Sequence, residues 1–343
     1  ICDNLARTME DANLNELGLA IPSNISIMAP SESGVRGTSL EIPKAVAQEA
    51  VDKKVGLIFN TGTVGFYLPA EVIGTLISTS EDANNLEISV QTVKEDLEDN
   101  GPEGMNLLGD LLDLNISVRN EEGLEFKPAS YGSKIIVTIS LAGIDLSQIN
   151  PEKLVVYRQI ERYNETTGQV ETSWECVGGR ISEDGKSIIF ETDHTSVYAV
   201  FVSNITFKDI QKHWAKEQVE VLAARQIVKG LAPDTFGPEV SVTRAQFTAI
   251  VLRALGIDEK SGLNQTFIDV KPGTWYYGAV ETAYAEGLVD GVGDGRFDPG
   301  RQISRQEMAV LIARALQQTG ADKSIGFDEI NNNLKRFKDR DEI

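Results

Sequence analysis

The chain has 343 residues, of which 41% are hydrophobic, and a formal net charge of −20. This length accommodates two or three domains with a sizeable core, and no apolar run of about 18 residues is present, so we expect no membrane insertion. The acidic residues are concentrated in residues 1–203, which carry 32 Asp and Glu against 14 Lys and Arg. Because a surface of this charge repels phosphate, we expect no nucleic-acid partner for this region.

Residues 1–203 predict a β-rich domain. A loosely helical pattern over residues 1–20 comes first. Segments of alternating apolar and polar residues, separated by turns rich in Gly, Asn and Asp, then favour an antiparallel, sandwich-like β domain. The predicted strands are 24–28, 39–42, 55–60, 64–68, 86–93, 112–119, 134–141, 153–162, 173–181, 187–192 and 197–202. Short helices are predicted at 41–54 and 67–79, where Pro43 and Pro69 stand at helix-starting positions.

The apolar period changes after residue 203. Residues 213–228 and 244–257 place apolar side chains three or four positions apart, which predicts amphipathic helices. This change of period predicts a domain boundary near residues 203–206.

The helical region contains an internal repeat. Residues 207–255 match residues 267–316, with an offset that increases from 60 to 61 after one inserted residue. A unit of helix, glycine-rich loop and second helix cannot bury its apolar faces alone, so such units stack on partners. Packing explains most of the matched positions, and turns that end helices explain Gly230 and Gly291.

Two arginines of the repeat stand in an electrostatically unfavourable place. Thr243 and Ser304 are predicted helix N-caps, and a Gln or Glu three residues later completes a capping box in each case. Arg244 and Arg305 follow the caps directly, where the positive end of the helix dipole disfavours a cation. Because free backbone N–H groups and a guanidinium together suit a carboxylate, we interpret these positions as an anion site. The alternative is a solvated arginine that pairs with a nearby loop acid.

Aromatic residues stand at matching positions of the two repeats. Trp214 and Trp275 are equivalent, and Tyr276 follows the second of them. Trp and Tyr stack on the apolar faces of sugars, although they also serve as core anchors. Beside an arginine at a helix start, these aromatic residues favour an acidic carbohydrate as the ligand.

The ordered pattern F-x-D, HWA, I-V-x-G, F-x-P and V-T-R-A-Q-F, present at 207–255 and again at 267–316, resembles the surface-layer homology (SLH) motif. Residues 336–343, RFKDRDEI, resemble the opening of a third copy. The resemblance implies that three motifs fold together as a three-pronged helical unit. It implies grooves that bind the secondary cell-wall polysaccharide of Gram-positive bacteria, often through pyruvylated sugars, and an extracellular location at the cell wall or S-layer. Residues 40–203 are similar to modules that precede SLH motifs in clostridial surface proteins.

The resemblance also implies roles for individual residues. The TRAE signature of the family reads TRAQ at 243–246 and SRQE at 304–307, so Gln246 replaces the usual Glu and Gln306 the usual Ala. The family's pattern gives the arginines contact with a ligand carboxylate and the tryptophans contact with sugar, and it implies that Arg244 faces Trp275. The expected polysaccharide-binding residues are Arg244, Arg305, Trp214, Trp275, Tyr276, Thr243, Ser304, Gly230 and Gly291.

No catalytic motif accompanies these residues. His194 and His213 have structural settings, and the GxSxG, HExxH, P-loop and Rossmann patterns are absent from the sequence. The loop 290–298 has acids at calcium-like spacing but lacks a closing Glu, which favours a tight turn. Cys2 and Cys176 lack zinc or CxxC spacing, so we expect two free thiols, and a disulfide between them is an open alternative. We expect no catalysis, cofactor or metal within these residues.

The sequence therefore predicts a multidomain α+β protein. Its predicted parts are an acidic β-rich domain at 1–203, all-α SLH helix-loop-helix motifs at 204–260 and 261–318, and a linker with the truncated start of a third motif at 319–343.

The predicted function is non-catalytic attachment of a cell-surface or S-layer protein to pyruvylated secondary cell-wall polysaccharide. Further copies of itself or other S-layer subunits are additional expected partners. The alternative is the wall-anchoring fragment of a secreted polysaccharide-degrading enzyme whose catalytic domain is not included, and a third possibility is a self-assembling surface-layer subunit. Because the first residue is Ile1, we expect a piece of a longer protein.

Overall fold

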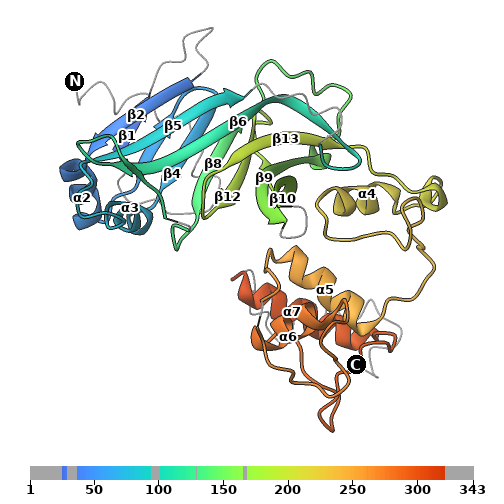
Figure 1. Ribbon diagram of the computed structural model, residues 1–343. Coiled ribbons are helices and arrows are strands. Elements are labelled where there is room, and N and C mark those ends of the chain that lie inside the picture. The colour runs from blue at the N-terminus through green and yellow to red at the C-terminus, as the bar shows by residue number, and fades with distance from the viewer. Residues whose placement is uncertain are drawn as a thin grey trace, which may run out of the picture. The chain divides into compact units, whose positions relative to one another are not determined.

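The computed structural model describes residues 25–28, 37–93, 101–128, 130–164, 168–260 and 262–320. They form two compact units that divide between Gln226 and Ile227 (Figure 1). The predicted helix at 1–20, Cys2 and the third-motif start at 336–343 lie outside the described residues.

The first unit is built on two β-sheets. The six-stranded sheet has the order β1 (Ile25–Met28), β3 (Leu57–Asn60), β4 (Val64–Leu68), β8 (Ile135–Ser140), β12 (Ser187–Thr192) and β11 (Arg180–Ile181). The seven-stranded sheet has the order β10 (Gln169–Gly178), β9 (Leu154–Asn164), β13 (Val197–Ser203), β6 (Met105–Arg119), β5 (Asn85–Val93) and β2 (Gly37–Pro43), and β7 (Glu125–Phe126) pairs with β6. All described strand pairs are antiparallel except β1 with β3, which is parallel. The predicted antiparallel β-rich domain is confirmed.

One hydrophobic core joins the two sheets. In β4 the burial alternates along the strand, so that Val64, Phe66 and Leu68 point into this core. The helices α2 (Lys44–Asp52) and α3 (Ala70–Ile77) lie side by side at one end of the unit and contribute to the same core (Figure 1). Both helices directly follow a proline, as the sequence predicts.

The helix α4 (Lys216–Ala224) belongs to the first unit, together with the short 3-10 helices η2 (Pro151–Lys153) and η3 (Lys208–Ile210). The carboxylate of Glu220, buried on α4, accepts hydrogen bonds from Lys153 Nζ at 2.6 Å and Thr206 Oγ1 at 2.5 Å. Gln226 Nε2 donates to the hydroxyl of Tyr157 on β9 at 3.0 Å. The β-rich unit therefore holds the first helix of the repeat region, and the two compact units divide inside the segment 204–260.

The second unit is helical. It contains α5 (Arg244–Ala254), α6 (Tyr277–Ala285) and α7 (Arg305–Gln318), which pack around one apolar cluster (Figure 1). A β-bridge between Thr243 and Gln302 joins the residues that precede α5 and α7. In the part of the chain that the structure describes, every helix is too short or too polar to cross a membrane.

Candidate functional site

The starts of α5 and α7 are closed by the predicted capping boxes. Thr243 Oγ1 accepts the N–H of Gln246, whose side chain accepts the N–H of Thr243 at 2.9 Å. Ser304 and Glu307 make the same two bonds on α7, the second at 2.9 Å. Both predictions of a capping box are confirmed.

The first turn of α5 offers no open set of N–H groups. The N–H of Arg244 donates to the carbonyl of Arg301 at 2.9 Å, and the N–H of Ala245 donates to the carbonyl of Pro299 at 3.2 Å. With Gln246 bonded to the cap, the first three N–H groups of the helix all have partners. The expectation of a vacant helix start at α5 is therefore wrong, because the loop before α7 occupies it.

The side chain of Arg244 is buried, with 8% of the residue exposed. Its Nε donates to the carbonyl of Phe297 at 2.9 Å, its Nη2 donates to the carbonyl of Asp290 at 3.1 Å, and its Nη1 pairs with Glu307. The guanidinium carbon also lies 4.6 Å from the centre of the Phe297 ring. These contacts use three of the five guanidinium N–H groups. Residues of the second repeat therefore bind the side chain of Arg244, which belongs to the first repeat.

Arg305 has a different environment. It is exposed and makes no side-chain hydrogen bond or ion pair with a described residue. The repeat explains the difference, because every partner of Arg244 belongs to the repeat that follows it. Residues 336–343 resemble the start of the repeat that would follow Arg305, and they lie outside the described residues.

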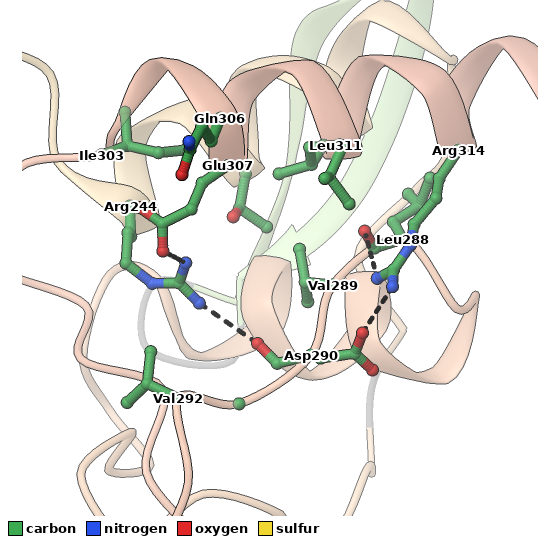
Figure 2. Close-up of a pocket in the computed structure, with 13 residues that line it drawn as sticks. Arg244, Leu288, Val289, Asp290, Val292, Ile303, Gln306, Glu307, Leu311 and Arg314 are labelled. Atoms are coloured by element: carbon green, nitrogen blue, oxygen red, sulfur yellow. Dashed lines mark hydrogen bonds and ion pairs between the residues drawn. The ribbon is translucent and has the colours of Figure 1, made fainter. Parts of the chain in front are cut away.

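Two cavities lie in the second unit, and each has a volume of about 320 Å³. The first-motif cavity is lined by Val228, Lys229, Gly230, Leu231, Phe236, Gly237, Pro238, Val240, Ser241, Val242, Gln246, Ala249, Ile250, Arg253 and Trp275. The second-motif cavity, drawn in Figure 2, is lined by Arg244, Thr248, Leu288, Val289, Asp290, Gly291, Val292, Ile303, Gln306, Glu307, Val310, Leu311 and Arg314.

These two cavities are copies of one framework. An offset of 61 residues relates most of the lining positions, including Gly230 to Gly291 and Arg253 to Arg314. In each case the glycine-containing loop after the first helix of a motif faces the second helix of the same motif. The neighbouring motif adds Trp275 to the first cavity and Arg244 to the second.

The first-motif cavity combines an aromatic face with two cations. Trp275 is 59% exposed, and the ring of Tyr276 packs edge-on against it with 5.4 Å between the ring centres. Lys229 and Arg253 line the same cavity, and their side chains make no hydrogen bond or ion pair with a described residue. An exposed indole beside two cations suits a sugar ring that carries a carboxylate.

The charges of the second-motif cavity are paired with one another. Arg314 Nη2 lies 2.5 Å from Asp290 Oδ2, while Glu307 pairs with Arg244 and accepts from Arg301 Nη2 at 2.7 Å. Figure 2 shows Arg244 and Arg314 reaching Asp290 from different sides. The hydrogen bond from Arg301, with those at the Ser304 cap and the charge of Arg244, lowers the pKa of Glu307 to about 2 despite the opposing effect of burial.

The structure separates some of the predicted site residues. Trp275 and Gly230 line the first-motif cavity, whereas Arg244 and Gly291 line the second, so Arg244 does not face Trp275 as the resemblance implies. Trp214 is 87% exposed in the first unit, where it contacts the ring of His213.

Sequence reasoning missed the two cations of the first-motif cavity. Arg253 was visible as a residue that recurs 61 positions later, as Arg314. Its place in the last turn of α5 has a simple electrostatic explanation, because a cation stabilises the C-terminal end of a helix. No sequence signal singled out Lys229, since the equivalent residue is Asp290.

The loop 290–298 is a turn fastened by the protein's own carboxylate. Asp269 accepts the N–H groups of Phe297 and Asp298, both at 2.8 Å. Burial raises the pKa of Asp269, and these two hydrogen bonds with the charge of Arg296 outweigh that effect and lower it. No group of three or more His, Cys, Asp and Glu residues is placed to hold a metal ion within the described ranges. Cys176 forms no disulfide with a described residue.

Comparison with known proteins places two segments of the chain in a family. Residues 206–248 and 266–309 match the family described as the S-layer homology domain. These two segments lie within the predicted motifs at 204–260 and 261–318.

The relatives include enzymes and surface proteins. An amylopullulanase of Thermoanaerobacterium thermosulfurigenes is 36% identical over 244 residues, which are 70% of this chain and 12% of that protein. A cellulosome-anchoring protein of Acetivibrio thermocellus is 32% identical over 145 residues, 40% of this chain and 32% of that protein. A surface-layer 125 kDa protein of Lysinibacillus sphaericus is 32% identical over 107 residues, 31% of this chain and 9% of that protein.

The match with the amylopullulanase extends beyond the repeat. At 244 residues it is longer than the whole segment 204–343, so it includes part of the β-rich region. The chain matches less than a third of the length of each of these three relatives.

Proposed function

The chain carries two S-layer homology domains, and since such domains anchor proteins at the cell surface, we propose that it fastens a larger protein non-covalently to secondary cell-wall polysaccharide. Binding of cell-wall polysaccharide by SLH domains in S-layer and anchoring proteins supports the general ligand class. The finer proposal is that the bound sugar carries a carboxylate, as a pyruvylated sugar does.

One observation carries this proposal, namely the content of the first-motif cavity. Trp275 offers an exposed indole on which the apolar face of a sugar ring can stack. Arg253 and Lys229 line the same cavity, and a guanidinium binds a carboxylate through two parallel N–H groups. Gly230 lets the loop backbone lie close to the ligand, because it has no side chain.

The remaining candidate residues have supporting roles in this proposal. Thr243 and Ser304 cap the helices that carry the lining side chains. Arg244 retains two N–H groups for a ligand hydroxyl in the second-motif cavity, and Arg305 and Trp214 each remain proposed polysaccharide contacts. The proposed domain division is a β-rich domain at 1–203, motifs at 204–260 and 261–318, and a linker with the start of a third motif at 319–343.

A specific observation favours a polysaccharide-degrading enzyme as the larger protein. The match to the amylopullulanase covers 244 residues, which is longer than the two SLH domains together. The match therefore reaches into the β-rich region. In this form of the proposal the present residues are non-catalytic and a catalytic domain belongs to another part of the protein. An S-layer subunit that also contacts its own copies is the other form, supported by similarity to a surface-layer protein.

The test is co-sedimentation of the 343-residue chain with purified Gram-positive sacculi, before and after extraction of the wall polysaccharide. We expect the chain to sediment with intact sacculi and to stay in solution with extracted ones. The substitutions Trp275→Ala and Arg253→Ala should each weaken binding about ten-fold or more, because each removes a direct contact.

Lys271→Ala is the matched control, since Lys271 is exposed, belongs to the same unit and lines neither cavity. It removes the same charge as Arg253→Ala and should leave sedimentation unchanged. Equal sedimentation with intact and extracted sacculi would refute polysaccharide anchoring. Loss of binding in Lys271→Ala to the same degree would instead indicate a general charge effect.

A further inference from the structure

The two repeat-related cavities share a framework and differ in charge. We infer that they have diverged in ligand class, so that the first-motif cavity selects a saccharide bearing a carboxylate and the second-motif cavity takes an uncharged saccharide. This inference rests on the proposed polysaccharide binding and assigns a different ligand class to each cavity.

Two pairs of equivalent positions create the difference. Lys229 in the first cavity corresponds to Asp290 in the second, and Gln246 corresponds to Glu307. The arginine on the second helix is present in both, as Arg253 and Arg314. The first cavity is therefore lined by two cations and no carboxylate, while the second is lined by two arginines and two carboxylates.

In the second-motif cavity, the protein's own carboxylates occupy the positions that a ligand carboxylate would need. Asp290 pairs with Arg314 and Glu307 pairs with Arg244, all four side chains lining the cavity (Figure 2). An acidic sugar would have to displace one of these carboxylates and leave it unpaired beside the incoming charge, which opposes binding. The guanidinium N–H groups that remain can donate to hydroxyl or amide oxygens of an uncharged sugar.

The capping role does not dictate the difference at the second pair of positions. Gln246 and Glu307 each close a capping box with the same two bonds. Either residue therefore satisfies the helix start, and what changes between them is the charge presented to the cavity. At the loop position Lys229 is exposed, and the carboxylate of Asp290 pairs with Arg314, so the charge of this residue also changes what is presented to the cavity.

The decisive variant gives the first cavity the residues of the second. Lys229→Asp combined with Gln246→Glu places in the first motif the two residues that the second motif already tolerates, and circular dichroism checks the fold. Calorimetric titration of the full chain uses soluble wall polysaccharide in two forms, native and with its carboxyl groups reduced to alcohols. The unaltered chain should bind the native form about ten-fold or more tightly than the reduced form at one site per chain.

In the double variant we expect this preference for the native form over the reduced form to disappear. Lys271→Asp, outside both cavities, introduces two of the three negative charge units of the double variant and should keep the preference. The reciprocal variant Asp290→Lys with Glu307→Gln should gain a second carboxylate-dependent site. A double variant that keeps the full preference for the native form would overturn the inference and leave wall binding intact. A chain that binds neither form would instead refute the proposed function itself.

Discussion

Arg244 at the start of α5 is ion-paired with Glu307 at the start of α7, so the capping residue of one motif neutralises the arginine of the other. The pair explains why a cation tolerates the first turn of a helix. The carboxylate, two carbonyl oxygens and the face of Phe297 surround the guanidinium and offset the helix dipole. The arginine thus joins consecutive motifs and lines a cavity at the same time.

Arg244→Ala should destabilise the second unit by about 2–4 kcal/mol. The substitution removes one cation from Glu307, which keeps Arg301, and it leaves the carbonyls of Phe297 and Asp290 without their buried guanidinium donor. Arg305→Ala changes the equivalent but exposed residue and should stay within about 0.5 kcal/mol of the unaltered chain. Urea unfolding followed by the helical circular dichroism signal measures both, and equal effects would contradict the structural role of Arg244.

The stability of the second unit should fall on acidification through the titration of Glu307. Hydrogen bonds from Arg301 and the Ser304 cap, with the charge of Arg244, lower the pKa of this carboxyl to about 2 in the folded chain. Because the folded pKa lies below the ordinary value, the stabilisation is complete above about pH 5 and is lost as the pH falls toward 2. The contribution of this group is about 2 kcal/mol after allowance for solvent screening.

Glu307→Gln isolates that contribution, since Gln246 shows that Gln also completes the capping box. The variant should be less stable than the unaltered chain at pH 7 and should lose less stability between pH 5 and pH 3. Urea titrations at each pH give the comparison. Parallel pH profiles for the two chains would exclude Glu307 as the source.

Lys153→Ala should loosen α4 from the β-rich unit. Lys153 donates at 2.6 Å to the buried carboxylate of Glu220, whose other partners among the described residues are Thr206 and the more distant Lys216. Loss of a cation from a largely buried pair costs about 2–3 kcal/mol. Lys216→Ala is the matched control, because Lys216 lies 3.9 Å from the same carboxylate and is more exposed, so its removal should cost about 0.5 kcal/mol or less.

Amide hydrogen exchange measures this effect where it arises. Exchange in α4 should accelerate in Lys153→Ala and remain near that of the unaltered chain in Lys216→Ala. Unchanged protection of α4 in both variants would show that the apolar contacts of the helix suffice to hold it.

Gly291→Ala should destabilise the second unit by about 1–3 kcal/mol. A Cβ atom at this position would lie 2.7 Å from the carbonyl oxygen of Arg296 and 2.8 Å from the ring of Phe267. Relieving the first contact requires a shift of the loop backbone, which costs free energy. Gly300→Ala is the control, because a Cβ atom there meets nothing within 4 Å. Thermal unfolding of both variants measures the difference, and a neutral Gly291→Ala would contradict the described path of the loop.

The sequence by itself determined the local elements and the repeat. Strand alternation located β4 and β12 with their observed bounds, Pro43 and Pro69 marked the starts of α2 and α3, and the capping boxes at Thr243 and Ser304 are present as predicted. These features depend on residues a few positions apart, where side-chain period and backbone hydrogen bonding leave few choices.

Only the tertiary structure decided which charges face one another. Arg244 pairs with Glu307, 63 residues away, and α4 finds Lys153 in the β-rich unit, 67 residues from Glu220. A one-dimensional repeat makes Arg244 and Arg305 equivalent, yet one is buried by the motif that follows it and the other is exposed. The same repeat conceals the difference between the two cavities, because the charge of a cavity depends on which side chains converge in space and on which of them are already paired.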